Sequence, residues 1–559
     1  MVSDDVLTLS LTRFLYLVGM KYLLLVVTVA TLGCQQRPDY TVRLTLDSAP
    51  VIPKPSRIRA DSNYLLFGPV IRPVFPEAAD SIMVNQLTRT WRQASGKMYD
   101  TLASAYTPDP VSIRFIRNDS LPDEGYRMQI NPEQIVIEAA TRTGWYWGTQ
   151  TLRQLFYTQL DTVVSGYALP TGIITDEPTY VHRGMMLDIA RHFFPADSIK
   201  TLIDPLTLYK INVLHLHLTD DQGWRIEIKS WPRLTDIGGS TEVGGGEGGY
   251  LTQEAFAELV RYAQEREIMI IPEVDMPGHT NAALASYAEL NDNKQATELY
   301  TGMRVGFSTL RVRDSITYQF LNDVIGELAA LYPGPYFHIG GDESEATDPD
   351  DYLYFVERVK QIVNRNGKQL IGWDEVARAT LDTTDVIQYW RHDDKAIRAA
   401  EQGASLIYSP ASHAYLDMKY NDSTRIGLTW AAPISVQLGY SWSPGDALKK
   451  AINKNYQLKL AALPDTLRSA IRGVEAPLWT ETVTTTNEQE YLTFPRLPGY
   501  AEIGWTPGSQ RNWEDYRTRL GRHARMLGTL EVNYYASPQV PWNLPLERFF
   551  IPPDTIKGR

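Results

Sequence analysis

Between residues 35 and 178, hydrophobic and polar positions follow no regular order of elements. Segments 126–130 and 135–139 alternate apolar and polar residues on either side of Asn131-Pro132-Glu133, which predicts a β-hairpin. Residues 144–155 place apolar side chains at helical spacing. Strands and helices that do not alternate regularly predict a small α+β domain here.

After residue 178 the pattern becomes strand, helix, strand, helix. Segment 252–267 is predicted to be a helix because Phe256, Leu259, Val260 and Ala263 fall on one face. Short apolar runs predict buried strands at 182–189, 212–218, 268–274, 336–339, 369–373, 385–390, 405–408 and 473–478. Parallel strands with intervening helices predict a (β/α)8 TIM barrel, with an open doubly wound sheet as the alternative.

Polar and aromatic residues that follow these strands favour the barrel. A barrel brings the C-terminal ends of its strands together around one mouth, whereas an open sheet spreads them along an edge. The residues in these positions are Asp220, Asp221, Asp275, Asp342, Glu343, Trp373, Asp374, Trp390, Trp479 and Glu481. We therefore expect an α/β protein with one shared site at the mouth of a barrel.

The length of 559 residues exceeds one compact domain. We expect an export signal at 1–34, the α+β domain at 35–178, the barrel at 179–510, and a C-terminal helix and tail at 511–559 packing on the barrel. Residues 513–530 are read as one helix that closes the barrel as its last outer element. A net charge of −12 without a basic stripe argues against a nucleic-acid partner.

The only cysteine, Cys34, follows a segment typical of export signals. Lys21 precedes an apolar run from Tyr22 to Leu32 that is short for a membrane span. The ending Leu32-Gly33-Cys34 resembles a bacterial lipoprotein signal, in which the cysteine is lipidated, although Thr31 departs from that pattern. This predicts an exported protein, lipid-anchored to a bacterial membrane at the periplasm or cell surface. The alternative is an uncleaved N-terminal anchor.

The sequence Gly340-Gly341-Asp342-Glu343 places two adjacent carboxylic acids behind two glycines at the end of a predicted strand. Neighbouring side chains on a regular strand point to opposite faces, so both acids can serve one cavity only where the backbone turns. Glycines permit that turn and a close approach of other groups. The alternative is a loop whose acids are simply solvated.

Several longer motifs resemble the family 20 glycoside hydrolases, the β-N-acetylhexosaminidases. They are Arg183 to His192, His215 to Arg225, Asp275 to His279, His338 to Glu343, Trp373-Asp374-Glu375, Gln388-Tyr389-Trp390, Tyr415-Leu416-Asp417 and Trp479-Thr480-Glu481. The family fold, an α+β domain before a (β/α)8 barrel, agrees with the pattern above. The resemblance implies an exo-acting, retaining hydrolase that removes terminal β-linked GlcNAc or GalNAc from oligosaccharides or glycoproteins.

The resemblance also implies a mechanism in which the 2-acetamido group of the substrate attacks C1 and forms an oxazolinium. Glu343 would protonate the leaving oxygen and then activate water. Asp342 would hold the acetamido N–H, and Tyr415 would donate to its carbonyl oxygen. His279 and Asp220 would form a relay with Glu343. A carboxylic acid must be protonated near neutral pH for this task, and a close like charge favours that state.

The remaining site residues are those expected to bind the sugar. Arg183 and Glu481 match family positions that grip O3 and O4, and Asp417 matches the one that reaches O4 and O6. Four tryptophans, Trp373, Trp390, Trp430 and Trp479, match the walls around the sugar. Aromatic faces pack well against sugar C–H groups, although single tryptophans are more often core residues.

Two alternatives remain open. His215 and His217 lie on one side of a strand, and Asp220, His279 and His338 could complete a hydrolase metal centre. The resemblance implies neither a metal nor an organic cofactor. The second alternative is a glycan-binding lipoprotein without catalysis, which would need the tryptophans but not the acid. The sequence indicates no oligomeric state.

Overall fold

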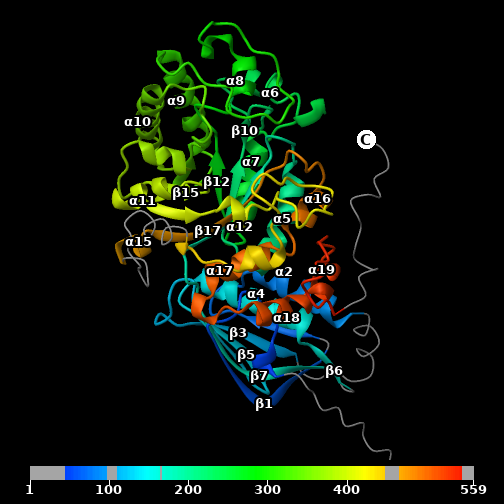
Figure 1. Cartoon of the computed structure of the whole chain (residues 1–559). Helices are drawn as coiled ribbons and strands as arrows, with labels where there is room; N and C mark the ends of the chain where they lie inside the picture. The colour runs from blue at the N-terminus through cyan, green and yellow to red at the C-terminus, as the bar shows by residue number, and fades with distance from the viewer. Residues whose placement is uncertain (1–44, 69, 97–109, 164–165, 447–464, 544–559) are drawn as a thin grey trace, which may run out of the picture.

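The computed structural model describes residues 45–68, 70–96, 110–163, 166–446 and 465–543. A twisted β-sheet formed by the N-terminal part lies at one end of the molecule, and a barrel lies at the other (Figure 1). The predicted export signal with Cys34 lies outside the described residues. Within the described residues, no helix combines the length and apolar character that a membrane crossing needs.

The N-terminal part is an α+β domain, as predicted. Its strands are β1 (Arg57–Phe67), β2 (Ile71–Val74), β3 (Val111–Arg117), β4 (Tyr126–Ile130), β5 (Gln134–Ala139), β6 (Asp161–Val163) and β7 (Gly166–Asp176). They pair in the order β1-β7-β4-β5-β3-β2, with β6 beside β7, and β4 and β5 form the predicted hairpin. Helices α2 (Ser81–Ser95) and α4 (Arg142–Thr158) lie between this sheet and the barrel (Figure 1).

Capping side chains determine where these two helices begin. The Asp80 carboxylate accepts the N–H of Met83, and the Thr141 hydroxyl accepts the N–H of Gly144. Each bond satisfies a backbone donor that has no partner within the helix. Both helices therefore begin where a short polar side chain precedes an amphipathic run.

Eight parallel strands close into a barrel in the order β12-β13-β14-β15-β16-β17-β8-β9. The strands are β8 (His182–Asp188), β9 (Val213–His217), β12 (Met269–Glu273), β13 (Tyr336–His338), β14 (Gln369–Trp373), β15 (Val386–Tyr389), β16 (Ser405–Tyr408) and β17 (Ile471–Leu478). Each overlaps a strand predicted from the apolar runs. The predicted fold class, a TIM barrel preceded by an α+β domain, is confirmed, and the open sheet is excluded.

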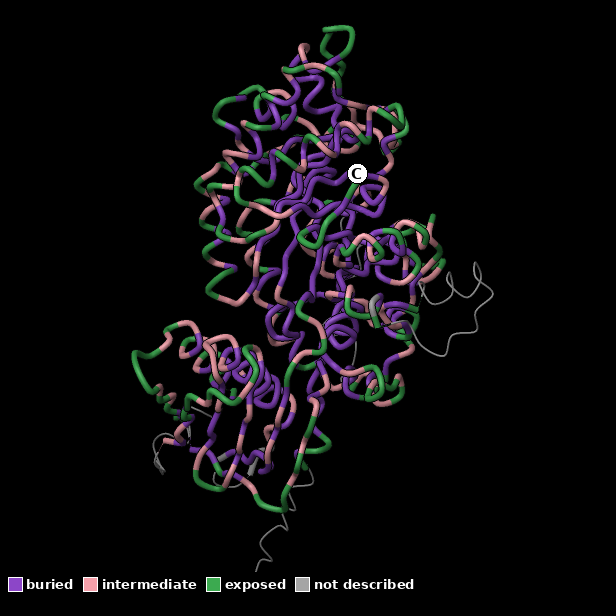
Figure 2. The backbone as a smooth tube through the Cα atoms, turned by 90° about the vertical axis from the view of Figure 1, so that its left-hand side faces the viewer, coloured by how far each residue is buried: buried purple, intermediate pink, exposed green. Residues whose placement is uncertain are grey.

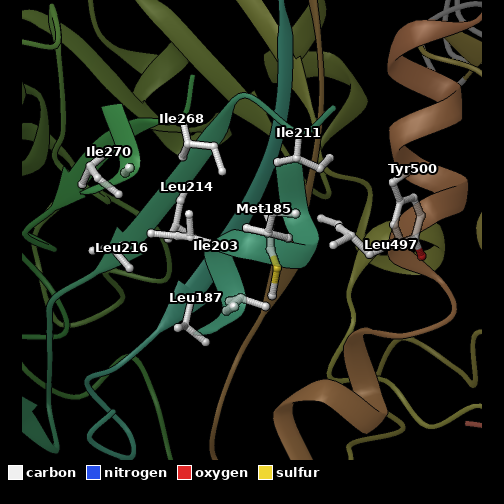
Figure 3. Close-up of a cluster of buried hydrophobic side chains, with 14 of the residues drawn as sticks. Met185, Leu187, Ile203, Ile211, Leu214, Leu216, Ile268, Ile270, Leu497 and Tyr500 are labelled. Carbon is white, nitrogen blue, oxygen red and sulfur yellow. The ribbon is translucent and has the colours of Figure 1, made fainter. Parts of the chain in front are cut away.

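Helices surround the barrel and bury its outer face. The longer ones are α5 (Ala196–Leu208), α7 (Gln253–Gln264), α9 (Ser315–Ala329), α10 (Pro349–Arg365), α11 (Asp393–Glu401), α16 (Thr486–Thr493) and α17 (Leu497–Trp505). Figure 3 shows strand residues Met185 and Leu214 beside Ile203 of α5 and Leu497 and Tyr500 of α17. The barrel strands are buried along most of their length, whereas the N-terminal sheet alternates between buried and exposed positions (Figure 2). This difference is expected for a covered parallel sheet beside a half-exposed one.

The connections between the barrel strands and helices contain short helices and strands. They are β10 (Thr219–Asp220), β11 (Gly223–Trp224), α6 (Arg233–Asp236), η2 (Val243–Gly245), α8 (Asn281–Ser286), η3 (Ala288–Leu290), η4 (Asp374–Arg378), α12 (Ala411–Ala414), α13 (Val436–Tyr440), α15 (Asp465–Ser469) and η5 (Gly508–Gln510). Before the N-terminal sheet lies η1 (Leu46–Ser48).

The prediction of one helix at 513–530 is wrong in two respects. The segment forms two helices, α18 (Trp513–Gly521) and α19 (Ala524–Thr529), separated at His523. The neighbouring segment 541–543 packs against the end of α18, so that a Cβ on Gly521 would lie 2.3 Å from the Pro541 carbonyl oxygen. The helix that packs on β17 and β8 is α17, while α19 reaches α4 of the N-terminal domain (Figure 1).

Candidate active site

The C-terminal ends of the barrel strands surround a cavity of about 410 Å³. Its lining combines carboxylates with aromatic and aliphatic side chains: Arg191, Met303, Val305, Asp342, Glu343, Trp390, Tyr415, Asp417, Leu428, Trp430, Trp479 and Glu481. Eight of the twelve residues predicted for the site line this cavity. Asp220, His279 and Trp373 lie behind its lining, and Arg183 lies elsewhere.

The turn after β13 brings Asp342 and Glu343 to the cavity together. Gly340 and Gly341 have φ angles of +64° and +94°, which favour glycine. A Cβ on Gly340 would lie 1.9 Å from Asp275 Oδ1, the atom that accepts the N–H of Gly341 at 3.0 Å. The predicted requirement for glycine at this turn is therefore confirmed. Glu343 itself has a φ of +39°, a conformation that an ordinary residue keeps only when its surroundings enforce it.

The two acids have different surroundings. Asp342 is buried, and its Oδ1 makes no hydrogen bond with any residue that the structure describes. Burial raises the pKa of Asp342 well above its usual range, and the nearby Asp275 carboxylate adds to the effect. The Glu343 side chain is more accessible, with 28% of its surface exposed. One acid is thus held inside the cavity wall while the other reaches toward its opening.

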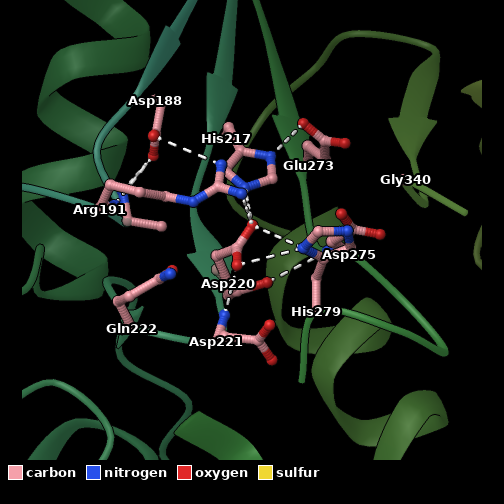
Figure 4. Close-up of polar contacts among 12 residues, drawn as sticks. Asp188, Arg191, His217, Asp220, Asp221, Gln222, Glu273, Asp275, His279 and Gly340 are labelled. Atoms are coloured by element: carbon pink, nitrogen blue, oxygen red, sulfur yellow. Dashed lines mark hydrogen bonds and ion pairs between the residues drawn. The ribbon is translucent and has the colours of Figure 1, made fainter. Parts of the chain in front are cut away.

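The His279 imidazole lies between these acids and a third carboxylate, that of Asp220, and Figure 4 shows the contact between His279 and Asp220. His279 Nδ1 lies 3.2 Å from the Asp220 carboxylate, and its Nε2 lies 3.8 Å from Asp342 Oδ2 and 4.0 Å from Glu343 Oε2. Burial disfavours the imidazolium, but Asp220, Asp275 and Asp342 outweigh it and hold the pKa of His279 well above its usual range. The predicted relay residues are therefore contiguous, with the His279 imidazole beside both acids.

The prediction that Arg183 binds the sugar is wrong. Arg183 is the second residue of β8, near the N-terminal end of the barrel, where its guanidinium is fully buried and pairs with Glu124. The arginine in the cavity is Arg191, which follows the C-terminal end of the same strand. Its Nη2 lies 2.7 Å from Asp220 Oδ2 and its Nη1 donates to Asp188 Oδ2 at 3.4 Å.

Arg191 could have been found from the sequence. It lies within the quoted motif from Arg183 to His192, and it is the arginine that follows the end of a predicted strand. Side chains at the N-terminal end of a barrel strand lie away from the mouth. The same criterion that selected Asp342 and Glu481 therefore selects Arg191 and rejects Arg183.

Two further acids in the cavity have carboxylate oxygens that accept no hydrogen bond from the described residues. Neither oxygen of Asp417, nor Oε2 of Glu481, has a hydrogen-bond partner among the described residues. Burial raises the pKa of both groups, and the Glu481 charge adds to the effect at Asp417. Leaving buried acceptors unpaired costs free energy, so such atoms are expected where a polar ligand binds. Hydroxyl groups would supply the missing donors.

Three tryptophans and a tyrosine form the aromatic part of the cavity. Tyr415 lies parallel to Trp390 at a ring distance of 6.3 Å and 6.2 Å from Trp479. Trp430 lies at the rim, 54% exposed, with its ring 5.8 Å from Tyr415. Trp373 is fully buried behind Trp479, at a ring distance of 5.8 Å. This arrangement offers a deep aromatic floor and one exposed aromatic edge.

Neighbouring polar groups hold the aromatic walls in position. The Asp374 carboxylate accepts the backbone N–H of Trp390 at 3.1 Å, and Glu375 Oε2 accepts its indole N–H at 3.1 Å. The buried Arg496 guanidinium donates to the carbonyls of Leu416 and Met418, on either side of Asp417. These contacts fix loops that otherwise have little regular structure.

The histidines considered for a metal site already have carboxylate partners. His215 Nδ1 hydrogen-bonds Glu475 at 2.8 Å, while His217 uses both ring nitrogens, with Glu273 at 2.6 Å and Asp220 at 3.1 Å. A metal ion needs a free nitrogen lone pair from each histidine. Binding at His217 would therefore require that both of its hydrogen bonds be rearranged.

Comparisons with known proteins agree with this geometry. The chain is similar to the β-N-acetylhexosaminidase of Cellulomonas fimi, with 39% identity over 438 residues that cover 78% of this chain and 85% of that protein. It is also similar to the solved family 20 β-N-acetylhexosaminidase of Streptomyces coelicolor A3(2), with 41% identity and a TM-score of 0.80 over 89% of this chain and 100% of that one. The N-acetyl-β-hexosaminidase of Streptomyces plicatus, solved in complex with Thio-NAglucal, has 42% identity and a TM-score of 0.80 over 89% of this chain and 99% of that one.

Family comparisons cover both parts of the chain. Residues 48–177 match domain 2 of glycosyl hydrolase family 20, and residues 180–352 and 348–508 match the catalytic domain of that family. Together with the barrel, the cavity and its paired acids, these matches show that the chain is a glycoside hydrolase and belongs to glycosyl hydrolase family 20.

Proposed function

We propose that this protein is an exo-acting, retaining β-N-acetylhexosaminidase that removes terminal non-reducing GlcNAc or GalNAc from oligosaccharides or glycoproteins. The observation that carries the proposal is the pair Asp342 and Glu343, adjacent in sequence and lining one cavity with Tyr415. The glycosidic oxygen and the acetamido nitrogen are substituents on adjacent carbons of one sugar, so two neighbouring side chains can reach both. The hexosaminidase relatives support the same substrate class.

In the proposed mechanism the acetamido oxygen of the substrate attacks C1 and the leaving oxygen takes a proton from Glu343. Asp342 accepts the acetamido N–H. Burial favours the neutral form of Asp342, and positive charge that develops on the nitrogen favours its ionised form at that step. Tyr415 donates to the acetamido carbonyl oxygen and orients the internal nucleophile. Glu343 then removes a proton from the water that opens the oxazolinium, which retains the configuration at C1.

The sugar hydroxyls would be bound by the polar side of the cavity. Asp417 and Glu481 provide buried oxygens without partners, and Arg191 provides a guanidinium fixed by Asp188 and Asp220. Trp390 and Trp479 would pack against the acetamido methyl group and the sugar face. Arg191 takes the role that Arg183 was expected to fill.

Kinetics with nitrophenyl β-glycosides test the proposal. The wild type should hydrolyse the N-acetylglucosaminide at least about 10³ times faster than the glucoside, because positioning an internal nucleophile contributes on the order of several kcal/mol. Asp342→Ala should lose about 10²–10³ in kcat although Glu343 remains, the range typical for removing one stabilising partner of a transition state. Equal turnover of the glucoside, near-normal turnover by Asp342→Ala, or no inhibition by a thiazoline analogue would contradict the mechanism. The paired galactosaminide measures tolerance of an axial O4.

The competing proposal, a glycan-binding protein without catalysis, requires the aromatic walls but no acid at the cavity mouth. It predicts that Glu343→Gln binds N-acetylglucosamine as the wild type does and that neither protein releases nitrophenol. Release by the wild type and its loss in Glu343→Gln would exclude it. The metal-dependent alternative predicts loss of activity with a chelator and recovery on adding the ion back.

We further propose that Cys34 is lipidated and anchors the protein to a bacterial membrane after export. Its support is the short apolar run before Leu32-Gly33-Cys34 in the sequence. Labelled fatty acid should be incorporated into the wild-type chain and not into Cys34→Ser. Incorporation into both proteins would contradict lipidation at this residue.

A further inference from the structure

Asp220 is held between two imidazoles, those of His279 and His217 (Figure 4). His279 lies 3.2 Å away on the cavity side, and His217 Nε2 lies 3.1 Å from Asp220 Oδ2 on the core side. Arg191 Nη2 lies 2.7 Å from the same oxygen. The charge and orientation of Asp220 therefore depend on His217 as well as on the residues at the cavity.

Behind His217 the arrangement continues into the barrel core. His217 Nδ1 and Glu273 Oε2 are 2.6 Å apart, and the Trp373 indole N–H donates to Glu273 Oε1 at 2.8 Å. His217 and Glu273 are paired in register across β9 and β12, so the backbone itself sets their separation. Both side chains are fully buried. The paired strands thus hold the Glu273 carboxylate next to the His217 imidazole, and the imidazole next to Asp220.

Charged groups from every neighbouring element bear on His217. The acidic groups are Glu273 at the end of β12, Asp275 after it, Asp188 at the end of β8 and Asp220 after β9. Arg191 and His279 are the other cationic groups beside Asp220. A carboxylate can only accept, so His217 Nδ1 donates to Glu273 and Nε2 donates to Asp220 when the ring is an imidazolium. Burial disfavours that form, but Glu273 and Asp220 outweigh it and hold the pKa of His217 well above its usual range.

We propose that His217, fixed by Glu273, is a positioning residue for the acid/base: it sets the orientation and the effective charge that Asp220 presents to His279, and through His279 the protonation of Glu343. The inference rests on the proposed function, in which Glu343 donates the proton. It extends the relay of Asp220 and His279 by two buried residues that make no contact with the cavity.

The sign of the effect follows from the charges. An imidazolium at His217 partly neutralises the charge of Asp220. When His217 is removed, the Asp220 carboxylate stabilises the protonated form of His279 more strongly. A more firmly protonated His279 stabilises the Glu343 carboxylate. A smaller fraction of the enzyme then carries the proton that an unactivated leaving group needs. Removing His217 should therefore move the alkaline limb of kcat/KM to lower pH.

The experiment compares His217→Gln with the wild type on two aryl N-acetylglucosaminides. A dinitrophenyl group leaves without a proton, whereas an unsubstituted phenyl group needs one. General acid catalysis contributes about 10²–10⁴-fold, so we expect kcat for the phenyl substrate to fall at least about tenfold more than kcat for the dinitrophenyl substrate. The alkaline limb of kcat/KM for the phenyl substrate should move down by about half a pH unit or more, since half a unit is about 0.7 kcal/mol.

Two more variants keep the test decisive. Trp479 contacts His217 edge-on at a ring distance of 4.9 Å, so the His217→Gln change could also displace Trp479 from the cavity wall. Such a displacement would raise KM for both substrates equally and leave the ratio of their kcat values unchanged. Glu273→Gln should reproduce the direction of the His217→Gln effect, because His217 then loses the carboxylate that keeps it charged. His182→Gln is the matched control: His182 bonds Glu475 at 2.9 Å near the other end of the barrel and should leave the ratio unchanged.

Equal losses on both substrates, or an unmoved alkaline limb in folded His217→Gln and Glu273→Gln, would overturn the inference. Failure of the proposed function gives a different result. In that case the wild type hydrolyses neither substrate, or Glu343→Gln loses activity equally on the phenyl and dinitrophenyl substrates.

Discussion

At the scale of single residues, position along a strand decides which of two arginines reaches the cavity. Arg183 and Arg191 flank β8 at its two ends. The buried Arg183 guanidinium pairs with Glu124 and donates to the Lys210 carbonyl oxygen at 2.9 Å, so it contributes to packing at the base of the barrel. Arg191 lies in the cavity beside Asp220 and Glu481. Their chemistry is identical, and only their location places one guanidinium in the cavity and the other in the packed base of the barrel.

Exchanging each arginine for lysine should separate these roles. Arg191→Lys keeps the charge but loses the planar fork, so kcat/KM should fall by on the order of 30- to 100-fold, the equivalent of one charge-assisted hydrogen bond at about 2–3 kcal/mol. Arg183→Lys should lower the free energy of unfolding by about 2 kcal/mol and leave kcat/KM within about threefold of the wild type. Steady-state kinetics and urea unfolding of both variants check this. A large loss of kcat/KM in Arg183→Lys with little effect in Arg191→Lys would mean that Arg183, and not Arg191, binds the sugar.

At the scale of elements, one buried histidine lies at the break between α18 and α19. His523 Nε2 faces the Pro50 carbonyl oxygen, which can only accept, so Nε2 carries the proton and Nδ1 accepts from Tyr209 at 3.1 Å. Burial lowers the pKa of His523 to about 4. Hydrophobic periodicity alone predicted one continuous helix here, because it does not register a contact with a residue more than 400 positions away.

This histidine predicts an acid-dependent loss of stability. The unfolded chain binds a proton near pH 6.5 and the folded one only near pH 4, so the unfolded state holds more protons between these values. The free energy of unfolding should therefore fall as pH decreases through this window, by about 1.4 kcal/mol per unit from this residue alone. His523→Gln should show a shallower decline than the wild type in urea unfolding measured at pH 7, 6 and 5. Parallel declines would mean that His523 is not the neutral buried group described above.

At the scale of the whole molecule, buried charges join the two domains. Lys210 Nζ, before β9, lies 2.8 Å from Asp176 Oδ2 at the end of β7 and 4.2 Å from the centre of the Trp505 ring in α17. Trp505 donates its indole N–H to Asp176 Oδ1 at 2.9 Å. Both charged side chains are fully buried. The N-terminal domain therefore braces the end of the barrel opposite to the cavity.

Removing one charge at this interface should destabilise the molecule without altering its chemistry. Lys210→Met leaves Asp176 buried without its cation, which typically costs about 3–5 kcal/mol. Lys210→Met combined with Asp176→Asn should recover part of that loss, because no uncompensated charge remains. Urea unfolding monitored by tryptophan fluorescence gives both values, and kcat of the folded variants should stay within about twofold of the wild type. If the double variant lost the sum of the single effects, the two groups would not be coupled.

The sequence by itself determined the eight barrel strands, the hairpin of the N-terminal domain and eight of the side chains that line the cavity. Apolar periodicity is a local property of the chain, so the ends of the strands can be located from the sequence. The acids and tryptophans of the site are the residues that follow these ends. The glycines before Asp342 predicted a turn, because glycine adopts positive φ angles more easily than any other residue.

Only the tertiary structure decided which buried groups meet. It divided the segment predicted as one C-terminal helix into α18 and α19, and it placed His217 and Glu273 behind Asp220. The physical reason is that hydrogen bonds and charge interactions act over a few ångströms in space between residues that are tens or hundreds of positions apart in the chain.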